Sequence, residues 1–374
     1  MANLLDYLAW RGDIRLSPEY PFNEVDSLVL ARLVAIKFEK TGSFTEGTIE
    51  EAVSAVLNAK DFQYVKEEDK QFCELMRRSE RFRGMRLSDF VTQYDEIIQQ
   101  QFAAMAVHTS PLECCIVYRG TDNTLVGWKE DMNMSYMRDL PSQRAAVAYA
   151  MRVGRNYPTK RLRLIGHSKG GNEAIYAALY LPPEFLRRIV RVDNFDGPGF
   201  SEEVIEENAY DDVLPKIHSY IPQGSVIGRL LEHAEDIVVV RSVRKGISQH
   251  NLYTWEVMKN EIVRETVMTE PSNVMDDTLK AWLKSTTPEE RSVFVEAIYQ
   301  IMTSTEAETT TEFKASLIRK LPLLWKTYRG INEEHRKKIT ELLFEFIKIY
   351  GRETKESLET RESRKSERQE KAEK

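Results

Sequence analysis

The feature that most limits how this chain can fold lies at residues 161–180, where an apolar run, a glycine-rich turn and an apolar helical pattern follow one another. Leu162, Leu164 and Ile165 form a short run typical of a buried strand, and from Ala174 to Leu179 apolar residues recur at helical spacing. The stretch therefore predicts a strand, a sharp turn and a helix, the repeating unit of α/β proteins.

The turn itself reads Gly-His-Ser-Lys-Gly at residues 166–170 and fits the pattern Gly-x-Ser-x-Gly. Because that pattern arises by chance in roughly one chain in ten of this length, its context carries the argument. Between a strand and a helix it is typical of a nucleophile elbow, in which glycines allow the tight turn and the hydroxyl of Ser168 reaches the rim of the sheet. The helix N-terminus then offers backbone N–H groups to a developing oxyanion. The alternative is a glycine-rich turn carrying an ordinary serine.

The rest of the pattern favours an α/β-hydrolase-like fold with a mostly parallel sheet, because helical segments separate most of the predicted strands. The predicted strands lie at residues 102–108, 113–118, 162–165, 189–195, 216–221 and 236–240, the first two forming a hairpin. Helices are predicted at residues 2–10, from Asn23, at 48–57, 87–98 and 141–157, and, after residue 252, only helices, at about 288–303, 311–328 and 332–350.

This pattern divides the chain into three parts. Residues 1–265 form the α/β-hydrolase-like domain, of which residues 1–100 are mainly helical, and residues 266–351 form a helical C-terminal extension ending at Gly351. Residues 352–374 are almost wholly Glu, Lys, Arg, Ser and Thr, so we expect a charged tail that is disordered or a solvated helix.

Composition excludes several function classes. A net charge of −6 argues against a nucleic-acid partner, and 42% hydrophobic residues suffice for a buried core. The three cysteines, two of them adjacent, form no disulfide framework, which favours a reducing compartment. No apolar stretch is long enough to span a membrane, and the acidic N-terminus lacks a signal pattern, so we expect a cytoplasmic protein. No histidine spacing indicates a metal site, and no cofactor is expected.

A serine nucleophile needs a base, and on this fold the acid and then the histidine follow the serine along the chain. The histidines after Ser168 are His218, His233, His250 and His335. The first falls inside a predicted strand, the second precedes one, and the last lies on a charged helix. His250 comes just after the last strand, where a loop can return it to Ser168, and is the preferred base.

Three aspartates are candidates for the acid that orients the histidine. Asp196 stands at the carboxyl end of the strand after the elbow, the edge at which α/β sheets bind ligands. Asp193 points differently in an extended segment, and Asp236 begins a strand at the opposite edge. We prefer Asp196, the alternative being an aspartate that only shapes its Asp-Gly turn.

Residues 116–122, Ile-Val-Tyr-Arg-Gly-Thr-Asp, followed by Trp-Lys-Glu-Asp at 128–131, resemble the strand and loop before the elbow of class 3 lipases. The elbow and the segment from His250 to Trp255 are similar to the same family. Over residues 5–260 the chain resembles a bacterial family of lipase-like α/β hydrolases, with which it shares the motifs at residues 6–13 and 21–26.

The resemblance implies that Ser168 is the nucleophile, His250 the general base, and Thr121 an oxyanion-hole donor beside the backbone N–H of Lys169. Two features depart from class 3 lipases. Their acid follows the strand after next, which here reads as residues 217–225 without a carboxylate, and the spacing from Thr121 to the tryptophan is one residue longer, with Gly127 in place of an acid or amide.

The expected function is a serine hydrolase that cleaves a carboxylic ester, of a lipid or another acyl group, through an acyl-enzyme. The alternatives are a thioesterase or acyltransferase using the same residues, and a hydrolase-fold binding protein whose C-terminal helices dock a protein partner. The Lys169 side chain would either favour an anionic substrate or be solvated. Residues 202–214 and 227–231 would form either a lid or ordinary packing helices.

Overall fold

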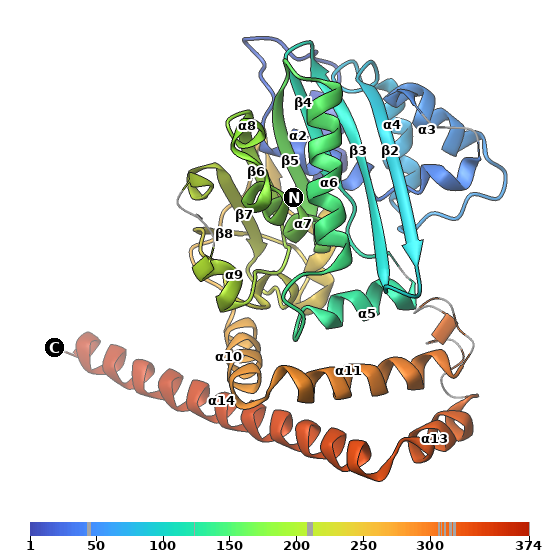
Figure 1. Cartoon of the computed structure of the whole chain (residues 1–374). Helices are drawn as coiled ribbons and strands as arrows, with labels where there is room; N and C mark the ends of the chain where they lie inside the picture. Colours follow the sequence, from blue (N-terminus) through green and yellow to red (C-terminus); the bar gives the residue numbers. More distant parts are fainter. Residues whose placement is uncertain are drawn as a thin grey trace.

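The computed structural model describes the chain apart from residues 43–45, 123, 208–211, 306, 308, 310–311, 314–315, 317–318 and 374, and its side chains as far as residue 359. Within these residues, the main sheet has eight strands that lie side by side in chain order (Figure 1). Strands β1 to β4 pair antiparallel and β4 to β8 pair parallel. The strands are β1 (Gly47–Thr48), β2 (Arg86–Asp95), β3 (Gln100–Ser110), β4 (Glu113–Tyr118), β5 (Arg161–His167), β6 (Ile189–Phe195), β7 (Ile217–Pro222) and β8 (Ile237–Val240). The predicted α/β class with a mostly parallel sheet is confirmed.

Two helical layers cover this sheet. One face packs against α1 (Leu4–Arg11), α2 (Glu24–Leu33), α3 (Ile49–Asn58) and α4 (Asp69–Arg78), and the other against α6 (Pro141–Asn156), α7 (Lys169–Tyr180), α8 (Pro183–Leu186) and α9 (Glu202–Glu207). Side chains alternate between the two faces along a strand, so the adjacent residues Cys114 and Cys115 belong to different hydrophobic cores. Both thiols, and that of Cys73, are free and buried.

The prediction of a helix over residues 87–98 is wrong, because these residues form most of β2 and pair with β3. The reason is a β-bulge between Ser88 and Val91, with Asp89 at a positive φ of 54°. The bulge shifts the alternation of the strand by one residue, so that the apolar residues recur at a spacing that imitates a helix. Beyond residue 252, where no strand is predicted, two short strands of two residues each, β9 (Val257–Met258) and β10 (Glu261–Ile262), also pair as a hairpin.

The C-terminal part contains α10 (Glu270–Ser285), α11 (Pro288–Thr303), α13 (Leu321–Gly330) and α14 (Glu333–Glu373). Gly351 lies within α14 and does not end it, and several residues of the helix predicted at 311–328 lie outside the described residues. In Figure 1, α11 runs along α5 (Leu125–Asn133), which follows β4. Among the described residues, none of the helices is long and apolar enough to cross a membrane.

Candidate active site

Ser168 lies at the turn between β5 and α7 with a strained backbone, at φ 59° and ψ −133°. A non-glycine residue adopts this region only where the surroundings enforce it. The enforcement comes from close packing: a Cβ at Gly166 would lie 1.9 Å from the carbonyl oxygen of Gly170. The backbone N–H of Ser168 also donates to the carbonyl of Phe195, at 2.9 Å, which ties the turn to the end of β6. The turn thus has the strand–turn–helix geometry of a nucleophile elbow.

Asp196 directly follows β6 and contacts His250, with 2.7 Å between its Oδ2 and the ring Nδ1. Its other oxygen, Oδ1, accepts a hydrogen bond of 2.5 Å from the Ser225 hydroxyl, and the whole side chain is buried. When Nδ1–H donates to the carboxylate, Nε2 is left unprotonated and can act as a base. The structure therefore brings together the preferred acid and the preferred histidine.

The other candidate acids and bases are engaged elsewhere or remote. Asp193 accepts hydrogen bonds from Ser27, at 2.7 Å, and Arg191, at 2.6 Å, and Asp236 is exposed. His233 contacts Glu235 and His335 is exposed on α14. Burial lowers the pKa of His218, the strand histidine.

The loop that carries His250 is held by its neighbours. The backbone carbonyl of Gln249 accepts a hydrogen bond of 2.8 Å from the buried indole of Trp255. Its side-chain oxygen accepts another, also of 2.8 Å, from the backbone N–H of Gly224. His167, the residue before Ser168, donates from Nε2 to the His250 carbonyl at 2.9 Å, and the two rings lie 4.4 Å apart. Burial lowers the pKa of His167 well below its ordinary value, so this ring is neutral. Sequence reasoning missed its role, although a titratable ring inside the elbow motif was a signal.

Ser168 and His250 thus belong to one site, because His167, the residue before Ser168, contacts His250. Among the described residues, no hydrogen bond joins the Ser168 hydroxyl to the imidazole. Such bonds are often long without substrate and tighten in the complex.

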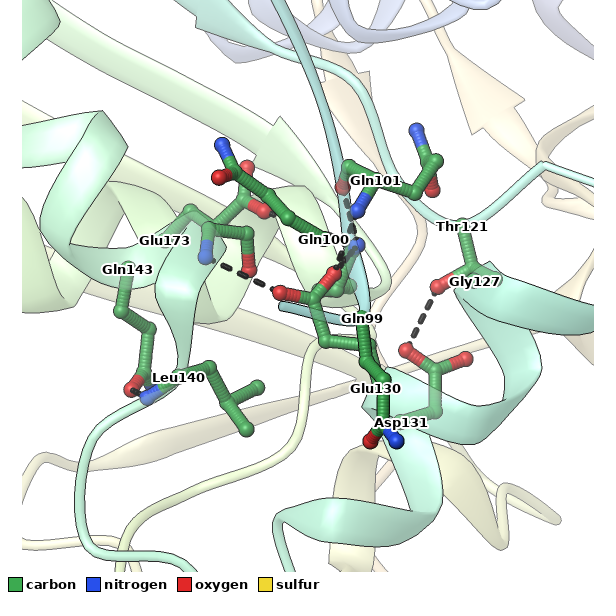
Figure 2. Close-up of polar contacts among 12 residues, drawn as sticks. Gln99, Gln100, Gln101, Thr121, Gly127, Glu130, Asp131, Leu140, Gln143 and Glu173 are labelled. Carbon is green, nitrogen blue, oxygen red and sulfur yellow. Dashed lines mark hydrogen bonds and ion pairs between the residues drawn. The ribbon is translucent and has the colours of Figure 1, made fainter. Parts of the chain in front are cut away.

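Thr121 lies beside the elbow on the loop after β4. A Cβ at the preceding residue, Gly120, would lie only 3.1 Å from the Cβ of Ser168. The Thr121 hydroxyl donates to Asp131 Oδ1 at 2.6 Å, as Figure 2 shows. Burial raises the pKa of Asp131 to about 6. The predicted oxyanion-hole residue is therefore close to the predicted nucleophile, with its side chain fixed by a carboxyl group.

The Lys169 side chain is not solvated, so that interpretation is wrong, and its ammonium is paired with a carboxylate of the protein. It is buried, and its Nζ donates to Glu130 Oε2 at 2.6 Å and to the Gln101 carbonyl at 2.5 Å. Glu130 in turn accepts from the Gln101 N–H at 3.0 Å, as seen in Figure 2. Removal of either partner would leave an unpaired charge in the interior, which is strongly unfavourable. The backbone N–H of Lys169 remains at the start of α7, where an oxyanion donor is expected.

A second buried carboxyl lies beside this pair. Glu173 Oε1 is 3.9 Å from Lys169 Nζ. Burial raises the pKa of Glu173 well above its ordinary value. For Lys169, burial lowers the pKa, but the neighbouring carboxylates, Glu130 first, raise it by more, so that its pKa lies above the ordinary value. Burial therefore favours the protonated form of Glu173 beside the Lys169–Glu130 ion pair. The cluster was missed because Glu130 lies 39 residues from Lys169 in sequence; the run of charges at 129–131 was the available signal.

A cavity of about 300 Å³ lies between the loop that follows Asp196 and the C-terminal helices. Its walls include Phe200, Leu231 and Leu283. Parts of both stretches expected to form a lid or packing helices line it, at Glu202 and Leu231, while residues 208–211 lie outside the described residues. In the described part of the chain, no three His, Cys, Asp or Glu side chains are placed to hold a metal ion.

Comparison with known proteins identifies a family. A protein-family model described as Mbeg1-like matches residues 76–300, a range that contains Ser168, Asp196 and His250 as well as α5 and most of α11. No curated protein and no solved structure matches the chain.

Proposed function

The chain belongs to the Mbeg1-like family, and we propose that it is a serine hydrolase that cleaves carboxylic esters through an acyl-enzyme. The observation that carries the proposal is the 2.7 Å contact between Asp196 and His250 beside a serine held in strained elbow geometry. A buried acid, an oriented imidazole and a serine at a helix N-terminus are the parts that activate a hydroxyl for acyl transfer.

In the proposed reaction, His250 Nε2 removes the proton of the Ser168 hydroxyl as Oγ attacks the ester carbonyl. Asp196 stabilises the imidazolium that forms, and the protonated imidazole then gives its proton to the leaving alcohol. The negative charge on the tetrahedral oxygen is stabilised by the backbone N–H groups of Lys169 and Thr121. Water, deprotonated by the same histidine, hydrolyses the acyl-enzyme.

The proposed substrate is a small-molecule or lipid ester, and no cofactor takes part. The hydrolysis of a thioester, or the transfer of the acyl group to an acceptor other than water, would use the same residues. These two reactions are the alternatives most similar to the proposed one. The proposed location is the cytoplasm, which the buried free thiols support.

A second candidate function is binding of a protein partner through the C-terminal helices. It is favoured by large apolar side chains that these helices expose to solvent, among them Trp325, Phe344 and Ile347. In that case the hydrolase-like site would be secondary to the interaction surface.

The experiment that tests the proposed function is stopped-flow hydrolysis of p-nitrophenyl esters of increasing acyl length. When deacylation is slower than acylation, an acyl-enzyme mechanism gives a burst of p-nitrophenol close to the enzyme concentration, followed by slower turnover. Ser168→Ala should abolish both phases. A protein that is folded by circular dichroism yet hydrolyses none of the esters would leave binding as the better account.

A further inference from the structure

Helix α5 is fixed by the C-terminal extension through a buried lysine. Lys129 of α5 is fully buried, and its Nζ donates to Glu296 Oε1 of α11 at 2.7 Å. The ammonium also lies over the rings of Tyr136 and Tyr299, 5.7 and 5.8 Å from their centroids. Tyr299 belongs to α11 as well, so one helix of the extension supplies two of the groups that surround this charge.

The two residues that follow Lys129 on α5 contact other parts of the structure. Glu130 forms the buried ion pair with Lys169, and Asp131 accepts the hydrogen bond from Thr121. Successive helical residues point about 100° apart, so three consecutive side chains can reach three different neighbours. Here they reach α11, the elbow helix α7 and the loop after β4.

We propose that α5 is the positioning element of the oxyanion hole, and that the C-terminal extension holds α5 in place through Glu296 and Lys129. This inference rests on the proposed hydrolase function. Both expected oxyanion donors belong to residues whose side chains are attached to α5: Lys169 through Glu130, and Thr121 through Asp131. A displacement of α5 would therefore move both donors together.

The charges make α5 resist displacement. Separating Lys169 from Glu130 would leave two unpaired charges in a buried region, which is strongly unfavourable. The start of α5 has a further contact with the extension, because Thr124, its N-cap, forms an antiparallel backbone bridge with Thr309. The position of α5 is thus determined by the elbow on one side and the extension on the other.

The test is the double variant Lys129→Met/Glu296→Gln in the full chain, assayed on the ester that the wild type hydrolyses best. It removes both charges without leaving one unpaired in the interior, and methionine suits the aromatic surroundings. Because small displacements of catalytic groups are costly, we expect kcat to fall about tenfold with KM nearly unchanged. Glu296→Gln alone, which keeps an acceptor for the Lys129 ammonium at a half-exposed position, should lower kcat in the same direction.

The matched control is Lys338→Met, which removes an ion pair that α11 makes with α14 through Glu290 instead of with α5. It should leave kcat and KM unchanged. The inference is overturned if the α5 variants keep wild-type kcat, or if KM rises while kcat stays constant, since the extension would then shape the substrate site. Failure of the proposed function is a separate result: the wild type itself would show no turnover and no burst.

Discussion

The imidazole of His167 lies against that of His250, with ring centroids 4.4 Å apart, and donates from Nε2 to the His250 carbonyl at 2.9 Å. The residue before the proposed nucleophile therefore supports the proposed base. His167→Phe keeps a ring in contact with His250 but cannot donate, so His250 loses one of its anchors. We expect kcat to fall about tenfold, with little change in KM.

Steady-state kinetics on an activated ester measures this effect. His167→Gln, which retains a donor of similar reach, serves as the matched variant and should recover part of the lost kcat. Equal activity of the phenylalanine and wild-type proteins would show that the ring contact has no role in orienting His250.

Replacing the buried acid tests which aspartate orients His250. In Asp196→Asn the amide cannot hold the same imidazole tautomer, so we expect kcat to fall by about 10³- to 10⁴-fold. Asp193→Asn is the control, because Asp193 is equally buried but contacts Ser27 and Arg191. That change should lower the melting temperature and leave kcat of the folded protein within about twofold. The reverse pattern would identify Asp193 as the acid.

The partly buried carboxyl of Asp131 makes stability depend on pH. Burial raises its pKa to about 6. An unfolded aspartate loses its proton near pH 4, so the folded state binds more protons between about pH 4 and about 6, and the contribution of Asp131 to stability is lost as pH rises through that window. Asp131→Asn, which still accepts from Thr121, removes this dependence.

Melting temperatures of both proteins at about pH 5 and about pH 8 test the sign, and the variant should gain relative to the wild type at the higher pH. A difference between the two proteins that is the same at both pH values would mean that Asp131 titrates normally.

The backbone of Ser168 predicts an unusual response to two small substitutions. At φ 59° and ψ −133° glycine is unstrained, whereas alanine keeps the steric conflict of serine. We expect Ser168→Gly to be more stable than Ser168→Ala by about 1 kcal/mol in urea unfolding, although glycine normally costs stability. Equal stability of the two variants would contradict the strained elbow.

The sequence was informative where the pattern is local. The apolar run at 161–165, the glycines around Ser168 and the helical spacing after it predict β5, the turn and α7, because each depends on neighbouring residues. Asp196 and His250 could be chosen because both follow strands, and strand ends meet at one edge of a parallel sheet.

The structure was needed where contacts join segments distant in sequence, or where a backbone irregularity changes the spacing of the apolar residues. The bulge in β2 gave its apolar residues a helical spacing, which no local rule distinguishes from a helix. The charged neighbours of the site pair across 39 residues, from Glu130 to Lys169, and across 167 residues, from Lys129 to Glu296. A lysine beside the nucleophile therefore suggested a substrate contact, because its partner could not be identified from the sequence.

Reaction with a fluorophosphonate probe is the most direct test of the claim that Ser168 is an activated nucleophile. We predict that intact-mass analysis of the wild type will show one adduct, that Ser168→Ala will show none, and that His250→Ala will react far more slowly. A folded wild-type protein that forms no adduct, or one that is modified equally in Ser168→Ala, would contradict the claim.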